Sequence, residues 1–319
     1  MEQEFAQFVA ALGRGPGRSR DLTQDEARTA FGMILRGEAD PIQVGAFLML
    51  LRYRGENPAT IAGLVEAARA HAGLPLAGVE ADLDWPSYGA GRTRGEPWFL
   101  LAALALAGQG VRVCMHGTNE FGQCASVASA LQRLGLAPAR DAADAAHSLR
   151  ARNFAYLPLA VLSAPLDRLL NLRRLFGLRS PVNTLVRLLD PADAAVSVDG
   201  VFHPSYVETH LGAAELLARR CLVVIKGGGG EVERSPFKAL AAYRWKCCEG
   251  RAEFVFPVLC ERGEEAADLV AVWRGEVLAP VAEATVLGTI ALAWFALGRV
   301  ETPEAADLAA VEIWKNRFN

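Results

Sequence analysis

The chain has 319 residues, of which 33 are Lys or Arg and 36 are Asp or Glu, so its formal net charge is −3. This balance excludes a uniformly basic protein that coats nucleic acid, but it leaves room for a local basic face. Apolar residues make up 52% of the chain, which is enough to bury a full-sized core and excludes an intrinsically disordered protein.

The sequence predicts neither a membrane span nor a secretory signal. The longest uncharged runs, 97–111 and 284–298, are shorter than the roughly 18 to 20 residues that a membrane-spanning helix needs. The N-terminus carries Glu2 and Glu4 and has no apolar stretch after a basic segment. We therefore expect a cytoplasmic protein without membrane contact.

Residues 1–75 are predicted to form a small N-terminal helical domain. Thr23 is followed three residues later by Glu26, which is the pattern of a capping box. Asp40-Pro41 and Asn57-Pro58 each combine an N-cap residue with a proline in the first turn. These signals predict four short helices that pack as a bundle.

From residue 76 onward, short β-rich runs alternate with helical stretches. Such alternation is typical of a mostly parallel central sheet flanked by helices, so we predict a larger α/β domain over 76–319. Ligands of such sheets bind beyond the carboxyl ends of the strands. The predicted strands are 111–115, 154–157, 195–198, 221–226 and 253–259, and the predicted helices lie near 97–109, 124–134, 164–176, 205–219, 264–272, 281–298 and 303–317.

One glycine-rich loop is a candidate phosphate site. It contains Gly89, Gly91, Arg92 and Arg94, ahead of a predicted helix. Glycines allow backbone N–H groups to approach an anion, and the two arginines add positive charge. A glycine-rich turn can equally be a purely structural element, so both interpretations stay open here.

Two further loops follow predicted strands. The first contains His116 and Gly117, and a lone histidine in such a place is more often structural than catalytic. The second begins at Lys226 and continues with four glycines. Because it lacks the GK[ST] ending of a P-loop, it excludes a nucleoside triphosphatase of that type.

Positive charge is concentrated in two segments. Residues 150–187 contain seven arginines and one acid, which is a net charge of +6. Residues 219–251 contain eight bases and three acids, which is a net charge of +5. The remaining residues of the chain therefore carry a net charge of −14. This segregation is typical of a polyanion-binding face, whereas the alternative is that the bases pair with acids elsewhere in the fold. The candidate nucleic-acid contacts are Arg150, Arg152, Arg168, Arg173, Arg174, Arg179, Arg187, Lys226, Arg234, Lys238, Arg244 and Lys246.

Several segments resemble the anthranilate phosphoribosyltransferases of glycosyltransferase family 3. Segments 43–48 and 50–56 resemble the family's helical domain, and 173–183 resembles its R-x-x-L-G-x-R-T-x-F-N motif. The resemblance covers nearly the whole chain and implies the family's fold, with a helical domain followed by an α/β domain. It also places Arg173 on the arginine that contacts the acceptor carboxylate in the family.

The departures from the family's motifs point away from catalysis. The family's G-T-G-G-D, which holds the diphosphate of phosphoribosyl pyrophosphate, is replaced by residues 89–93, which lack the Asp. The family's K-H-G-N-R is replaced by residues 115–119, which lack the Lys. The Asp-Glu pair that binds Mg²⁺ is replaced by 229–233, which leaves Glu231 or Glu233 as the only matching carboxylate. Because departure of the diphosphate depends on metal and cations, these losses imply a rate lower by several orders of magnitude.

A YbiB-type branch of this family shows the same departures, and that resemblance implies a dimer that binds nucleic acid. We therefore expect a non-catalytic homodimer without a cofactor or metal, which binds DNA or RNA in a groove walled by both basic segments. The alternative is a Mg²⁺-dependent phosphoribosyltransferase with an altered substrate, and a third interpretation is a scaffold that binds only protein. The vestigial substrate site would comprise Gly89, Gly91, Arg92, Arg94, His116, Gly117 and Arg173, with Glu231 or Glu233 on Mg²⁺ if the protein is active.

Overall fold

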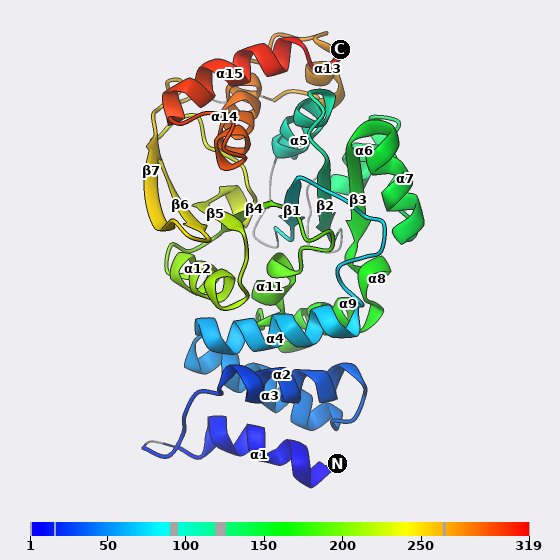
Figure 1. The fold of residues 1–319 in the computed structure, drawn as a ribbon, viewed down its shortest axis with the longest axis vertical. Coiled ribbons are helices and arrows are strands. Elements are labelled where there is room, and N and C mark those ends of the chain that lie inside the picture. The colour runs from blue at the N-terminus through cyan, green and yellow to red at the C-terminus, as the bar shows by residue number, and fades with distance from the viewer. Residues whose placement is uncertain (1, 16, 90–94, 119–125, 264–265, 319) are drawn as a thin grey trace.

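The chain folds into a helical N-terminal part and a larger α/β part, which Figure 1 shows stacked along the long axis of the molecule. This architecture confirms the predicted fold class. No helix in the described part of the chain is long and apolar enough to cross a membrane. The computed structural model describes residues 2–15, 17–89, 95–118, 126–263 and 266–318.

The capping signals place the N-terminal helices correctly. The Thr23 hydroxyl accepts a hydrogen bond from the backbone N–H of Glu26, and the Glu26 carboxylate accepts one from Thr23, so the predicted capping box is formed. Asp40 and Asn57 likewise cap the two following helices. The four helices are α1 (Glu2–Gly13), α2 (Gln24–Leu35), α3 (Pro41–Arg54) and α4 (Pro58–His71).

The capping box also predicts how the stability of the helical domain depends on pH. Arg20 donates two hydrogen bonds of 2.6 Å to the Glu26 carboxylate, which lowers the pKa of Glu26 to about 2. Because folding lowers this pKa, the stabilising contribution is complete above about pH 4.5 and is lost as the pH falls through 2. We expect Glu26→Gln to lower the melting temperature by about 1–2 °C at pH 7 and by much less near pH 2.

This expectation is checked by calorimetric scans of both proteins between pH 2 and pH 7. Glu312→Gln removes a comparable but more exposed partner of Lys315 and serves as the control. A difference between wild type and Glu26→Gln that stays constant with pH would contradict the assigned role of the carboxylate.

The described residues of the α/β part form a seven-stranded sheet in the order β3-β2-β1-β4-β5-β6-β7. The first five strands in this order are parallel, and the last two pair antiparallel, so the sheet is mostly parallel as predicted. The strands are β1 (Leu83–Ser87), β2 (Val113–Gly117), β3 (Phe154–Pro158), β4 (Val196–Val201), β5 (Cys221–Lys226), β6 (Leu240–Lys246) and β7 (Gly250–Phe256).

Two strands were not anticipated by the sequence pattern. β1 contains Asp84 and Pro86 in its interior, and both residue types are depleted in strands. β6 ends in a polar stretch that resembles a surface segment, because it lies near the outer side of the sheet and only part of it is buried. Tertiary pairing therefore overrides local preference at both positions.

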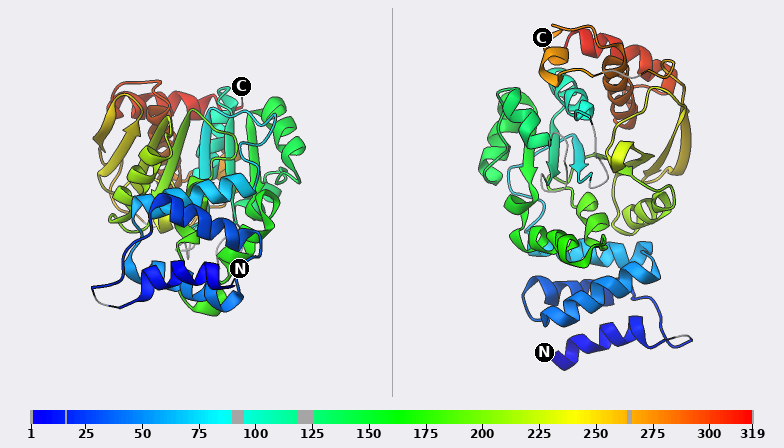
Figure 2. Two further views of the ribbon diagram at one scale, coloured as in Figure 1. Left: turned by 60° about the horizontal axis from the view of Figure 1, so that its bottom comes forward. Right: turned by 180° about the vertical axis from the view of Figure 1, so that it is seen from behind.

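Helices cover both faces of the sheet. One face packs against α5 (Trp98–Gly108), α14 (Pro280–Ala296) and α15 (Pro303–Lys315), which Figure 2 shows at the end of the molecule opposite the N-terminal bundle. On the other face, α11 (Val182–Leu185) and α12 (Tyr206–Leu216) separate the sheet from α4. The remaining α/β elements are α6 (Val127–Arg133), α7 (Ala142–Arg152), α8 (Leu159–Leu162), α9 (Ala164–Asn171), α10 (Arg173–Phe176), η1 (Val186–Leu188), η2 (Gly228–Gly230) and α13 (Leu269–Arg274).

Candidate functional site

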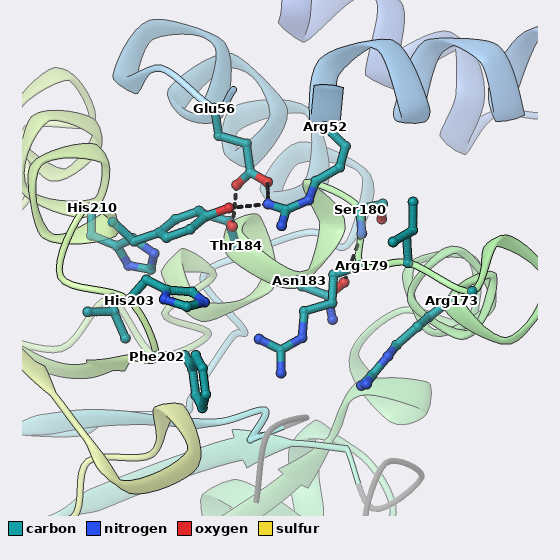
Figure 3. A pocket seen from close by; sticks show the side chains of 14 residues that line it. Arg52, Glu56, Arg173, Arg179, Ser180, Asn183, Thr184, Phe202, His203 and His210 are labelled. Atoms are coloured by element: carbon teal, nitrogen blue, oxygen red, sulfur yellow. Dashed lines mark hydrogen bonds and ion pairs between the residues drawn. The ribbon is translucent and has the colours of Figure 1, made fainter. Parts of the chain in front are cut away.

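A cavity of about 360 Å³ lies where the helical part meets the loops of the α/β part. Three segments that are distant in the sequence form it: the end of α3, the stretch from α10 to α11, and the stretch from the end of β4 into α12. Figure 3 shows their side chains around a common space. The lining residues are Arg52, Glu56, Arg173, Gly177, Leu178, Arg179, Ser180, Asn183, Thr184, Val201, Phe202, His203, Tyr206 and His210.

Arg52 and Glu56 close the cavity on the helical side, and their charges offset each other. Their side chains lie 3.4 Å apart, Arg52 also donates to the Tyr206 hydroxyl, and Thr184 donates its hydroxyl hydrogen to Glu56. Glu56 is almost fully buried. This network joins α3 to α11 and α12 and holds the two parts of the chain together.

Arg179 carries a positive charge that is not offset within the described ranges. It makes no ion pair with a carboxylate there, and its guanidinium lies 5.6 Å from the centre of the Phe202 ring. Burial lowers the pKa of Arg179, and the positive charges of Arg173, Arg187 and Arg52 lower it further. An anion in the cavity would relieve this repulsion. Figure 3 shows Arg173 and Arg179 directed toward the same space as Phe202.

Asn183 presents a second unsatisfied donor at the cavity. Its Oδ1 accepts a hydrogen bond of 3.1 Å from the backbone N–H of Ser180, which identifies the other end of the amide as the nitrogen. That Nδ2 is buried and has no hydrogen-bond partner among the described residues. Because an unpaired buried donor costs about 1–3 kcal/mol, the site favours a ligand with acceptor oxygens.

His210 connects the cavity to the buried side of β4. Its Nδ1 lies 2.5 Å from Asp199 Oδ2, while Arg187 Nη1 lies 3.3 Å from the other carboxylate oxygen. Asp199 is buried and Arg187 is nearly so. The carboxylate thus fixes the orientation of the His210 ring and offsets the charge of Arg187.

The chain's own carboxylates accept hydrogen bonds from backbone donors at Gly89 of the predicted diphosphate loop and at the start of α5. Glu231 is buried and accepts a hydrogen bond from the backbone N–H of Gly89, and a Cβ at Gly89 would overlap this carboxylate. Glu233 accepts a hydrogen bond of 3.2 Å from the N–H of Phe99 in the first turn of α5. Gly91, Arg92 and Arg94 lie outside the described residues.

Glu231 and Glu233 do not fit the role of magnesium ligands that the alternative function requires. Each carboxylate already accepts a backbone hydrogen bond, and the backbone of Glu231 is packed against Gly200 and Gly227, which fixes the residue in place. A metal ligand needs oxygens that converge on a shared, accessible point. In the described ranges, no group of three or more His, Cys, Asp or Glu side chains could hold a metal ion.

His116 and Gly117 have structural surroundings. His116 is fully buried, its Nδ1 lies 2.8 Å from the Tyr88 hydroxyl, and its Nε2 lies 3.2 Å from Asp84. Gly117 lies so close to the carbonyl of Ser87 that a Cβ would overlap it. Both residues help to pack β1 against β2. This surrounding fits the expectation that a lone histidine after a strand is structural and not catalytic.

The twelve predicted nucleic-acid contacts do not form one groove. The parallel strands β1 to β5 all end at the same edge of the sheet, which we call the carboxyl edge. We call the opposite edge, where these strands begin, the amino edge. Arg150 and Arg152 end α7 just before β3, and Arg244 and Lys246 pair with the start of β5, so these four lie at the amino edge. Six residues lie at the carboxyl edge, because they follow the end of β3, end β5 or precede the start of antiparallel β6: Arg168, Arg173, Arg174, Arg179, Lys226 and Lys238.

The structure corrects the assignment of Arg234, which has no exposed surface. Its guanidinium pairs with Asp307 at 2.5 Å, donates to the carbonyl of Pro257 at 2.6 Å and stacks 4.8 Å from the centre of the Phe256 ring. Arg187 is also mostly enclosed and paired, as described above. Neither side chain forms part of an open basic surface, because a charge count does not distinguish buried ion pairs from exposed bases.

Sequence reasoning missed several residues of the cavity. Arg52 and Glu56 lie in a segment whose only signal in the sequence is its resemblance to the family's helical domain. Phe202, His203 and His210 follow β4, whose end was predicted three residues early. The general expectation that ligands bind beyond the carboxyl ends of parallel strands was the signal that could have found them.

Comparison with known proteins decides the family. The helical bundle domain of a glycosyl transferase family matches residues 6–72, and the a/b domain of that family matches residues 99–255. Anthranilate phosphoribosyltransferase of Myxococcus xanthus is 32% identical over 72% of this chain and 68% of its own length. The chain belongs to glycosyltransferase family 3. The predicted family is therefore confirmed.

Two other proteins show how far the similarity extends. The uncharacterised protein YbiB of Escherichia coli is 28% identical over 73% of this chain and 73% of its own length. The structure of Saccharomyces cerevisiae anthranilate phosphoribosyltransferase in complex with PRPP and Mg has a TM-score of 0.79, covering 99% of this chain and 95% of the yeast chain. At 17% identity, the latter similarity establishes the fold alone.

Proposed function

We propose that this member of glycosyltransferase family 3 binds the phosphates of nucleic acid at its carboxyl edge and does not transfer phosphoribosyl groups. The observation that carries the proposal is Arg179, whose charge is not offset within the described ranges and which lies beside Arg173 in a cavity. Arginine suits this role because its planar guanidinium can donate two parallel hydrogen bonds to one phosphate. Arg168 and Lys226 extend the positive charge along the same edge as exposed side chains.

The carboxylates at the predicted diphosphate loop support the non-catalytic part of the proposal. Glu231 and Glu233 accept hydrogen bonds from Gly89 and Phe99, the backbone donors that could otherwise face an anion. Negative side chains at that place oppose binding of a pyrophosphate. The proposal therefore includes no cofactor and no Mg²⁺.

The proposal retains a cytoplasmic homodimer. An apolar hollow between α1 and α3 is lined by Val9, Ala46, Leu50 and Ile42, and Ile42 is 84% exposed. Exposed apolar patches of this kind are typical of association surfaces. A twofold axis across the helical domains would duplicate the carboxyl edge and double the number of phosphate contacts.

The test is fluorescence anisotropy of labelled oligonucleotides at several salt concentrations. We compare wild type with the triple variant Arg173→Ala/Arg174→Ala/Arg179→Ala. Each lost phosphate contact is expected to reduce the slope of log K against log salt by about 0.9 on duplex DNA and about 0.7 on a single strand. The triple variant should thus bind more weakly and with a flatter salt response.

The matched control is Arg150→Ala/Arg152→Ala at the amino edge, where both side chains are exposed. It should leave the affinity and the slope close to those of wild type. An equal loss in this control would place the interface elsewhere, and an affinity that does not respond to salt would exclude phosphate-dominated binding.

A further inference from the structure

We propose that the cavity binds a phosphomonoester, and that on nucleic acid this group is a terminal phosphate of the strand. The inference rests on the proposed function and deepens it, because it distinguishes strand ends from internal phosphates. Three properties of the cavity carry it: its charge, its unsatisfied donors and its size.

The charge of the cavity matches a doubly negative group. Its lining contains three arginines, Arg52, Arg173 and Arg179, and one carboxylate, Glu56, so the formal charge of the lining side chains is +2 with neutral histidines. Glu56 contacts Arg52 and Thr184, so it is held on the helical side of the site. An internal phosphodiester carries one negative charge, whereas a phosphomonoester carries about −1.5 to −2 at pH 7.

The unsatisfied donors match the oxygens of such a group. Asn183 Nδ2 is buried without a partner among the described residues, and the Arg179 guanidinium makes no ion pair within them. A terminal phosphate offers three strong acceptor oxygens, which is enough for both donors and for Arg173. A carboxylate or an internal phosphodiester has only two unsubstituted acceptor oxygens on its carbon or phosphorus atom.

The size of the cavity favours a strand end over a duplex segment. A volume of about 360 Å³ cannot enclose a duplex, whose major groove alone is roughly 12 Å wide. It lies within the range of pockets that take small ligands. Phe202 and His203 form an edge-to-face aromatic pair beside the arginines, with ring centres 4.7 Å apart, and present a surface for a sugar or base next to the phosphate.

The experiment uses one internally labelled oligonucleotide in three forms, with a 5′-phosphate, with a 3′-phosphate and with hydroxyl groups at both ends. Anisotropy titrations of the full-length protein measure the affinity of each form at fixed salt. We expect at least one phosphorylated form to bind about tenfold more tightly than the hydroxyl form, because two or three charge-assisted hydrogen bonds are added.

Two single variants assign this difference to the cavity. Arg179→Gln keeps a polar side chain but removes the charge, and it should reduce the ratio between phosphorylated and hydroxyl forms to about one. Arg150→Gln makes the same change at the amino edge and should leave the ratio unchanged. Circular dichroism and melting of Arg179→Gln check that it is folded, and Asn183→Leu provides an independent second disruption of the site.

The free ligand is a separate arm of the same experiment. A nucleoside 5′-monophosphate and inorganic phosphate should each displace the phosphorylated oligonucleotide more readily than the hydroxyl form.

Equal affinity for all three forms of the oligonucleotide would overturn the terminal-phosphate inference, while salt-dependent binding would still support the proposed function. Binding of the monophosphate without binding of any oligonucleotide would overturn the proposed function and make a free nucleotide the occupant. Binding of neither would overturn both.

Discussion

Replacing Arg234 with alanine is expected to lower the free energy of unfolding by about 3–5 kcal/mol, which corresponds to a drop in melting temperature on the order of 10 °C. The variant removes one partner of a buried ion pair and leaves Asp307 and the carbonyl of Pro257 without their donor. It also removes the stacking on Phe256. Urea unfolding followed by tryptophan fluorescence measures the effect.

Two comparisons separate this structural role from a role in binding. Arg168→Ala changes an exposed arginine of α9 and should shift the free energy of unfolding by less than about 0.5 kcal/mol while it weakens nucleic-acid binding. Asp307→Ala combined with Arg234→Ala should cost less than the sum of the two single variants, because the pair is coupled. An Arg234→Ala protein of normal stability and reduced affinity would mean that this side chain lies in the interface.

We expect no phosphoribosyl transfer to anthranilate in the presence of phosphoribosyl pyrophosphate and Mg²⁺. The loss of a single charge-stabilising donor costs about 10²–10³-fold in rate, and this chain lacks several of the family's groups. A rate at least about 10³-fold below that of the Myxococcus xanthus enzyme in the same fluorescence assay is the expected result. Calorimetry of phosphoribosyl pyrophosphate with the wild-type protein should show no heat of binding.

A variant of this protein makes the reason testable. Glu233→Ala frees the N–H of Phe99 at the start of α5 and should improve binding of pyrophosphate relative to wild type. Under the alternative function the same variant removes a magnesium ligand and should make binding worse. Turnover in wild type that disappears in Glu231→Gln would establish the transferase and contradict our proposal.

The sequence predicted the elements whose signals are local. The caps at Thr23, Asp40 and Asn57 placed three helix starts correctly, and the apolar β-branched run of β5 matches its prediction residue for residue. β1 was missed because Asp84 and Pro86 are unfavourable in an isolated strand, while in the fold β1 is paired on both sides. Long-range pairing is not visible in a local pattern.

The site was predicted only in part, for a similar reason. Arg173 and Arg179 were found because arginines are dense in one segment and because that segment resembles a family motif. Arg52 could not be found, since it reaches the cavity from the helical part, more than 100 residues before Arg173 in the sequence. His210 was missed because β4 was predicted to end three residues early, which hid the stretch that follows it. Charge counting also placed Arg234 in the interface, although burial and pairing decide whether a base is available to a ligand.

The carboxylates of Glu231 and Glu233 act as ligands built into the chain. An enzyme whose loop amides await a substrate gains stability when substrate is added, by RT ln(1 + [L]/Kd). Here the amides of Gly89 and Phe99 already donate to carboxylates of the same chain, which a dissolved diphosphate would have to displace. The loops after β1 and β5 are therefore joined to each other without a ligand, and the thermal stability of this protein should not depend on the cellular level of phosphoribosyl pyrophosphate.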